Sequence, residues 1–277
     1  MTTGSTVRFP SGAKVPALGQ GTWHMGDDPA RRAQELAALR RGLDLGMTLI
    51  DTAEMYGDGA AEDLVGEAIR GRWDEVFLVS KVLPYHADRR GTVRACQESL
   101  RRLGTDRIDL YLLHWRGSVP LAETVEALES LVADGSVGAW GVSNLDVADL
   151  NELPGRARPD TDQVLYNLTR RGPEYDLFPH LRERGVPIMA YSPLEQARVL
   201  GHGALGDVAA AHGCTPAQVA LAWVLRHPDV IAIPQASSVA HVEDNHAALS
   251  LRLTDEDLRA LDAAFPPPTR KRSLEML

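Results

Sequence analysis

Eight short apolar runs, separated by longer segments of helical periodicity, are the feature of this 277-residue sequence that most limits its fold. Apolar residues fill each run almost without alternation, which is typical of a strand buried on both faces. The runs cover residues 16–23, 47–53, 76–82, 108–115, 137–144, 163–167, 187–194 and 230–235. Eight buried parallel strands joined by crossover helices predict the α/β class and a (β/α)8 TIM barrel.

Helical periodicity is clearest in residues 30–46, 94–104, 121–135 and 216–227. Thr215, Pro216 and Gln218 predict an N-cap, a first-turn proline and a capping-box partner for the last of these helices. Thr254 predicts a similar cap for a further helix.

A β-hairpin is expected in residues 7–16, where two short extended pieces flank Ser11 and Gly12. It would precede the first barrel strand and close the barrel floor. No stretch rich in Pro, Gly and Ser separates two halves of the chain, so we expect a single domain over residues 1–277.

The charge balance indicates small-molecule partners. A net charge of −9 and a pI near 5.5 argue against a nucleic-acid or anionic-membrane surface. Cys96 and Cys214 form no C-x-x-C pair, so neither a disulfide framework nor a zinc site is indicated. The first twelve residues show no apolar targeting region. We expect a cytoplasmic monomer without a membrane span or a bound metal.

Four titratable residues lie at or just after the ends of successive runs: Asp51, Tyr56, Lys81 and His114. Singly, each has an ordinary reading as a strand cap, a loop aromatic, a snorkelling side chain or a core histidine. Lysine occurs at only three positions among 29 basic residues, however, so a lysine within an apolar strand needs a specific reason. In a barrel these strand ends meet on one face, which predicts a catalytic site.

The chemistry of this group suits protonation of an alkoxide that forms from a carbonyl. We expect the Lys81 ammonium to lower the pKa of the Tyr56 phenol and favour the phenolate. Asp51 would pair with Lys81, and His114 would bind the carbonyl and help pass the proton. The group lacks a hydride source, so a nicotinamide cofactor is implied.

Six ordered motifs, "LIDTAEMYG", "FLVSKV", "IDLYLLHW", "GVSN", "YSPL" and "AIPQASS" followed by an asparagine, resemble the aldo-keto reductases over essentially the whole chain. The likeness is closest to the bacterial methylglyoxal-reductase-like members. The resemblance implies a (β/α)8 barrel that uses NAD(P)H without a Rossmann domain. It also implies that Asp51, Tyr56, Lys81 and His114 are catalytic, with the tyrosine as proton donor.

The same resemblance implies the cofactor contacts. Three residues would bind the nicotinamide carboxamide and a fourth would stack on the ring: Ser143, Asn144, Gln163 and Tyr191. Thr22 and Trp23 would line the site, and Ser192 and Leu194 would cover the pyrophosphate. The residues that bind the adenosine end would be Ser237, Ser238 and Asn245, with Asn245 facing adenine.

The adenosine end departs from the family pattern. Many members clasp the 2′-phosphate of NADPH with a Lys after "IP" and an Arg six residues later, where this chain has Gln235 and His241. Arg270 or Arg272 in the tail is a candidate replacement. We expect use of NADPH with a reduced preference over NADH.

The substrate is expected to be a small carbonyl compound. An aromatic wall is predicted from Trp23, His24, Tyr85 and Trp115, and the loops that follow the strands are short. An open pocket of this kind favours aldehydes, dicarbonyls or small ketones.

Three alternatives compete with this interpretation. A nucleotide-binding sensor would keep the barrel with little turnover. A metal-dependent hydrolase would need paired histidine ligands, and the nine histidines show no H-x-H or H-E-x-x-H spacing. A doubly wound dinucleotide-binding fold would need a third glycine where His24 stands in residues 19–24.

Overall fold

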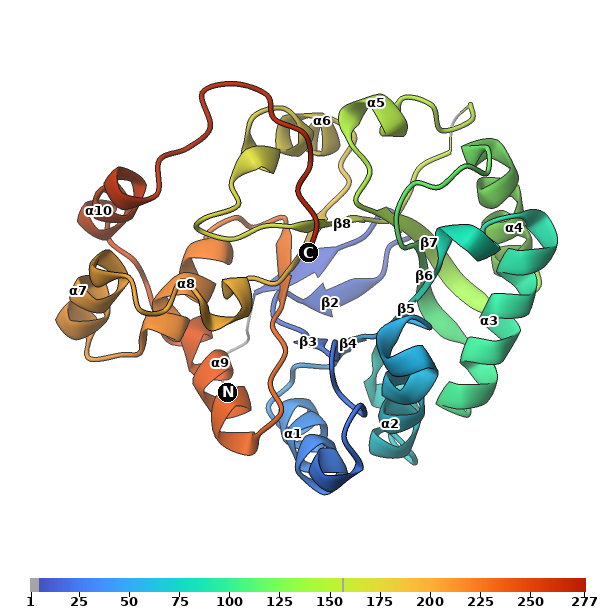
Figure 1. Ribbon diagram of the computed structural model, residues 1–277, viewed down its shortest axis with the longest axis horizontal. Coiled ribbons are helices and arrows are strands. Elements are labelled where there is room, and N and C mark those ends of the chain that lie inside the picture. Colours follow the sequence, from blue (N-terminus) through green and yellow to red (C-terminus); the bar gives the residue numbers. More distant parts are fainter. Residues whose placement is uncertain (1–4, 156) are drawn as a thin grey trace.

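Eight parallel strands form a single sheet in the computed structural model, which describes residues 5–155 and 157–277 (Figure 1). The first four residues of the N-terminal segment considered above lie outside the described residues. The order of the strands in the sheet is β10-β9-β8-β7-β6-β5-β4-β3. Their bounds are β3 Gln20–Gly21, β4 Leu49–Asp51, β5 Phe77–Val82, β6 Ile108–Leu113, β7 Val137–Ser143, β8 Asp162–Leu165, β9 Ile188–Tyr191 and β10 Val230–Ile233. Each strand overlaps one of the predicted runs.

The sheet closes between its first and last strands. Parallel bridges join Leu18 to Ala232 and Gly21 to Gln235, and the backbone N–H of Gly21 donates to the oxygen of Pro234 at 3.0 Å. Closure requires glycine here, because a Cβ on Gly21 would lie 2.7 Å from the oxygen of Ile233. The predicted (β/α)8 barrel is confirmed.

Helices surround the barrel (Figure 1). They are α1 Arg32–Asp44, α2 Ala60–Ala68, α3 Arg89–Leu103, α4 Leu121–Ala133, α5 Val147–Leu150, α6 Leu177–Glu183, α7 Gly203–His212, α8 Pro216–Val224, α9 Val239–Ala247 and α10 Asp255–Ala264. Thr215 and Thr254 cap α8 and α10 as predicted. The predicted capping box at Gln218 is wrong, because its side chain donates to Asp244 instead of reaching back to the cap. Within the described part of the chain, no helix is long and apolar enough to cross a membrane.

The predicted hairpin is present. β1 (Thr6–Arg8) and β2 (Lys14–Pro16) pair antiparallel. Its apolar side chains pack with those of the barrel strands in one interior cluster: Val7, Phe9, Val15, Ala17, Leu49, Val79, Leu110, Leu112, Ala139, Met189, Ile231 and Ile233. The backbone N–H of Ser11 at the turn donates to Asp160 at 3.0 Å. The hairpin therefore seals the amino end of the barrel and leaves the carboxyl end open.

Candidate active site

Polar side chains follow the interior apolar ones by two residues on several barrel strands. Because residues two apart in a strand share a face, these polar groups also point into the barrel, nearer its carboxyl end. The pairs are Leu49 and Asp51, Val79 and Lys81, Leu112 and His114, and Met189 and Tyr191. The short helical turn Tyr56–Gly59 after β4 adds Tyr56 to the same place.

Lys81 is at the centre of this group and is fully buried. Its Nζ donates to Oδ2 of Asp51 at 2.8 Å, to the backbone oxygen of Thr52 at 2.8 Å and to Oη of Tyr56 at 3.0 Å. All three protons of an ammonium group thus have an acceptor. The structure brings Asp51, Tyr56 and Lys81 together as the sequence predicted.

Burial and neighbouring charges set the protonation of Lys81 and Tyr56. Burial is the largest single influence and alone would lower the pKa of Lys81, but the charges of Asp51 and Tyr56 and the hydrogen bonds to both together raise it above its ordinary value. Burial raises the pKa of Tyr56, and Lys81 offsets this only in part. The predicted lowering of the phenol pKa is therefore wrong in net direction, since desolvation is the larger effect. Tyr56 keeps its proton at neutral pH and is able to donate it.

His114 lies at the end of β6, with its ring edge-on to Tyr56 and the two ring centroids 5.9 Å apart. Burial, with a smaller contribution from Lys81, lowers the pKa of His114 to about 2. The imidazole is therefore neutral at physiological pH, and its part in passing the proton stays a prediction. Nδ1 is buried and has no hydrogen-bond partner among the described residues. The ring is suited to hydrogen bonding with a ligand.

A second hydrogen-bonded group lies beside the first. Nε2 of Gln163 donates to Oδ1 of Asp51 at 2.7 Å, a contact that the sequence did not predict. Tyr191 donates to Oδ1 of Asn144 at 3.0 Å, and Nδ2 of Asn144 donates to Oγ of Ser143 at 3.0 Å. These predicted cofactor residues therefore hold one another in place across β7, β8 and β9.

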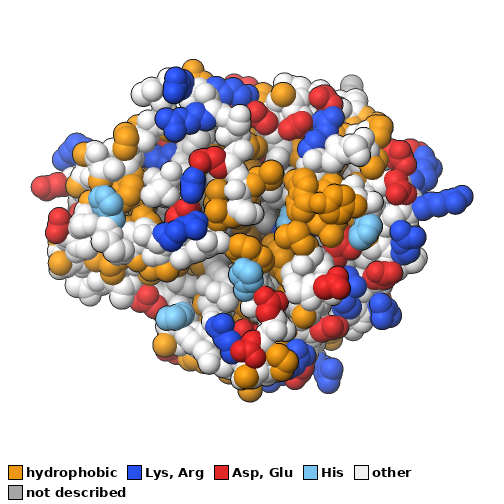
Figure 2. Space-filling model, in the orientation of Figure 1, with side chains coloured by type: hydrophobic (Ala, Val, Ile, Leu, Met, Phe, Trp, Pro, Cys, Tyr) orange, Lys and Arg blue, Asp and Glu red, His pale blue; other side chains and the backbone are white. Residues whose placement is uncertain are grey.

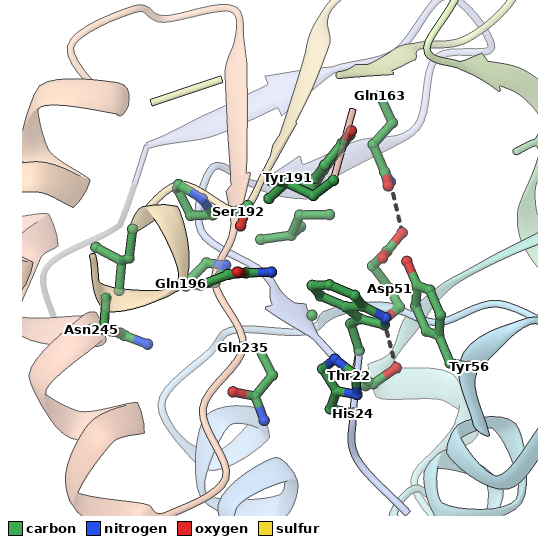
Figure 3. Close-up of a pocket in the computed structure, with 18 of the residues that line it drawn as sticks. Thr22, His24, Asp51, Tyr56, Gln163, Tyr191, Ser192, Gln196, Gln235 and Asn245 are labelled. Atoms are coloured by element: carbon green, nitrogen blue, oxygen red, sulfur yellow. Dashed lines mark hydrogen bonds between the residues drawn. The ribbon is translucent and has the colours of Figure 1, made fainter. Parts of the chain in front are cut away.

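One cavity of about 820 Å³ spans this end of the barrel. Figure 2 shows the face hollowed near its centre, with hydrophobic side chains gathered on one side of the hollow. Figure 3 shows Gln163, Asp51 and Tyr56 on one side of the cavity and Gln196, Gln235 and Asn245 on the other. The predicted residues that line it are Thr22, Trp23, His24, Asp51, Tyr56, His114, Trp115, Ser143, Asn144, Gln163, Tyr191, Ser192, Leu194, Gln235, Ser237, His241 and Asn245.

Three predicted residues do not line the cavity. Lys81 lies buried behind Tyr56 and Asp51. Tyr85 is 75% exposed and only reaches Trp115 edge-on, so its place in the aromatic wall is wrong. Ser238 caps α9, where its hydroxyl accepts from the backbone of His241. Among the described residues, no group of three or more His, Cys, Asp or Glu side chains could hold a metal ion.

Some lining residues were missed. Two signals were available for them, the cap of α8 at Thr215 and the loop that follows β9. No sequence pattern places the chain's last residues over the barrel, which only the path of the tail decides (Figure 1). The lining residues that were not predicted as site residues from the sequence are Gly21, Met55, Pro193, Gln196, Ala197, Leu200, Thr215, Pro216, Ala217, Ile233, Pro234, Asp244, Met276 and Leu277.

The loop at residues 192–197 borders the cavity in a left-handed conformation. Glu195, Gln196 and Ala197 have φ values of 50°, 53° and 66°, which side chains other than glycine rarely adopt. Glu195 is buried, and its carboxylate accepts from Asn167 at 2.8 Å and from Arg170 at 3.0 Å. These bonds hold the loop against its backbone strain.

Comparison with known proteins agrees with this geometry. The profile of the Aldo/keto reductase family matches residues 17–203 and 195–265. Methylglyoxal reductase YeaE of Escherichia coli (strain K12) is 51% identical over 279 residues, which are 98% of this chain and 98% of that protein. The NADH-specific methylglyoxal reductase of the same organism is 29% identical, over 87% of this chain and 91% of its own.

A solved structure gives the same result. The aldo/keto reductase from Klebsiella pneumoniae in complex with NADP and acetate is 54% identical and superposes with a TM-score of 0.96, over 99% of this chain and 100% of that one. Both its barrel and its sequence match. This chain is therefore an oxidoreductase that belongs to the aldo/keto reductase family.

Proposed function

We propose that this protein reduces aldehydes, dicarbonyl compounds and small ketones to alcohols, with NADPH as the favoured hydride source and Tyr56 as proton donor. One observation carries the proposal: Nζ of Lys81 lies within hydrogen-bond distance of both the Tyr56 hydroxyl and the Asp51 carboxylate, directly beneath a large cavity. A buried phenol in contact with an ammonium group is a proton donor whose conjugate base is stabilised.

The donors and acceptors of the cavity fit a nicotinamide dinucleotide. The side-chain amide of Asn144 and the Oε1 of Gln163 complement a carboxamide, and the ring of Tyr191 offers a face for stacking. At the far side, the amide of Asn245 suits a purine edge. Two Klebsiella pneumoniae relatives, each 54% identical, were solved with NADP or NADPH. When bound, such a cofactor supplies the hydride that reduces the carbonyl carbon.

The residues of this chain then handle the carbonyl oxygen. A carbonyl oxygen placed between Tyr56 and His114 accepts a hydrogen bond from the neutral imidazole. As the oxygen gains negative charge, Tyr56 gives it the phenolic proton. The Lys81 ammonium stabilises the phenolate that remains, and Asp51 keeps that ammonium in place.

The substrate end of the cavity supports a small carbonyl compound. Trp23, Met55 and Trp115 line it together with Leu277, so apolar walls surround the reacting group. Such walls exclude water and accept short side chains without selecting between them. The name of the 51% identical relative, a methylglyoxal reductase, supports a small dicarbonyl among the substrates.

The test is the loss of reduced-nicotinamide absorbance with methylglyoxal or an aromatic aldehyde as substrate. Tyr56→Phe should lower kcat about 10²- to 10⁴-fold while the Kd for NADPH stays the same. Tyr175→Phe, at a partly exposed position away from the cavity, is the matched control and should keep full activity. Tight cofactor binding without turnover of several carbonyls would contradict the proposal and favour a nucleotide-binding sensor.

A further inference from the structure

The adenosine end of the cavity lacks a positive charge. Among the described residues that line the cavity there is no lysine or arginine, and Gln235 and His241 line this end of it. A phosphate group that leaves water needs charge-assisted hydrogen bonds, which arginine supplies best. A cation that binds a 2′-phosphate must therefore belong to a residue that lies next to the lining residues and is not one of them.

Arg31 is the cation in that position. It ends the short helical turn Pro29–Arg31 before α1, and its Nη2 donates to Oγ of Ser237 at 2.6 Å. Ser237 lines the cavity just after β10. The Arg31 side chain is 49% exposed, and this is its only hydrogen bond within the described residues. The guanidinium has further N–H groups free for a ligand next to Ser237.

The fold fixes the position of Arg31 relative to Ser237. α1 lies beside α9 (Figure 1), and Arg41 of α1 pairs with Glu243 of α9 at 2.8 Å. Asp28 holds the turn before α1, because its carboxylate accepts from the backbone of Ala30 at 2.9 Å. The contact between Arg31 and Ser237 therefore belongs to a packed helix pair.

The acidic groups nearby leave Arg31 available. Glu35 lies 3.8 Å from Nε of Arg31, and its other oxygen accepts from the backbone of Gly26 at 2.9 Å. Asp244 lines the cavity, but its carboxylate accepts from Thr215 and Gln218 on the side of α8. Glu35 is thus within ion-pair distance of Nε but forms no hydrogen bond with Arg31, and Asp244 makes neither contact, so the Nη groups of Arg31 stay available.

The tail does not supply the cation. Lys271 pairs with Asp146 at 3.0 Å and with Asp176 at 2.9 Å, next to α5 and α6. Figure 1 shows this part of the tail on the side of the barrel away from α9. Arg270 and Arg272 flank Lys271 and do not line the cavity, so the structure gives no support to the expectation that one of them replaces the missing cation.

We propose that Arg31, aligned by the hydroxyl of Ser237, binds the 2′-phosphate of NADPH and is the residue by which this site prefers NADPH to NADH. The inference rests on the proposed function, since it assumes that a nicotinamide dinucleotide occupies the cavity. The first turn of α9 adds the positive end of a helix dipole at the same place.

The test compares the dissociation constants for NADPH and NADH, each measured by the quenching of tryptophan fluorescence. Arg31→Ala should weaken NADPH binding about 10- to 100-fold and change NADH binding less than about 2-fold. Ser237→Ala should give a smaller effect of the same kind. Arg32→Ala is the matched control, because the adjacent Arg32 pairs with Glu67 on the far side of α1.

Each outcome decides a different question. NADPH binding that is unchanged in Arg31→Ala, or a loss that is equal for both cofactors, overturns the role of Arg31 and leaves the reductase proposal standing. Failure of the wild-type protein to bind either cofactor overturns the proposed function and this inference together. A selective loss of NADPH affinity that Arg32→Ala does not share supports the inference.

Discussion

The side-chain amide of Gln163 holds the carboxylate of Asp51 on the oxygen that Lys81 does not use. Nε2 of Gln163 donates to Oδ1 at 2.7 Å, and Nζ of Lys81 donates to Oδ2 at 2.8 Å. Asp51 is almost fully buried, so these bonds compensate the desolvation of both its oxygens. A residue of β8 that lines the cavity is thereby joined to the ion pair between β4 and β5.

Loss of this bond should disturb Asp51 without removing it. Gln163→Met keeps the volume of the side chain but leaves Oδ1 of Asp51 without its donor, so we expect unfolding free energy to fall by about 1.5–3 kcal/mol. We also expect kcat to fall, because Lys81 loses a fixed partner. Urea unfolding and steady-state kinetics measure both. Gln97→Met on the exposed face of α3 is the control, and equal stability of the two variants would contradict the role of Gln163.

The buried ion pair should be more costly to break than to remove. Lys81→Met leaves the Asp51 carboxylate buried without its counter-ion, and we expect a loss of about 3–5 kcal/mol in unfolding free energy. The double variant Asp51→Asn, Lys81→Met should recover much of that loss, since no charge is then buried. Both the single and the double variant should remain inactive. A double variant that is as unstable as Lys81→Met would show that the unpaired Asp51 charge does not cause the loss of stability.

His114 should make the protein less stable as the pH falls. Its folded pKa of about 2 lies below the ordinary value of 6.5, so below that value the unfolded chain binds a proton that the folded chain excludes. The stability penalty grows as the pH falls below about 6.5, reaching about 2 kcal/mol between pH 7 and pH 5. Urea unfolding at pH 7 and pH 5 measures the difference in unfolding free energy between the two pH values. In His114→Gln this difference should be smaller than in the wild-type protein by about 2 kcal/mol. An unchanged difference would mean that His114 is protonated in the folded state.

Glu195 should affect both cofactors equally, in contrast to Arg31. Its carboxylate holds residues 192–197 in the left-handed conformation through Asn167 and Arg170. Glu195→Ala removes those bonds, so the strained loop should relax away from the cavity. We expect Kd values for NADPH and NADH to rise together, by about 10-fold. Glu129→Ala on the exposed face of α4 is the control, and a loss confined to NADPH would contradict this role.

The sequence identified the residues whose positions follow from strand periodicity. Asp51, Lys81 and His114 end apolar runs, and alternation along a strand that is buried on both faces sends them into the barrel interior. The same periodicity predicted the number of strands and hence the barrel. Local turn chemistry predicted the hairpin and the N-caps Thr215 and Thr254.

Contacts between distant segments depended on the tertiary structure. No pattern pairs Gln163 with Asp51, or Arg31 with Ser237 from 206 residues away, because such contacts depend on how closed strands and neighbouring helices lie. The net pKa of Tyr56 was also decided there, since burial depends on every group packed around it. The pattern of apolar runs is a property of neighbours along the chain, so the sequence alone determined which residues stand at the strand ends. Only the closed barrel decided which of them meet.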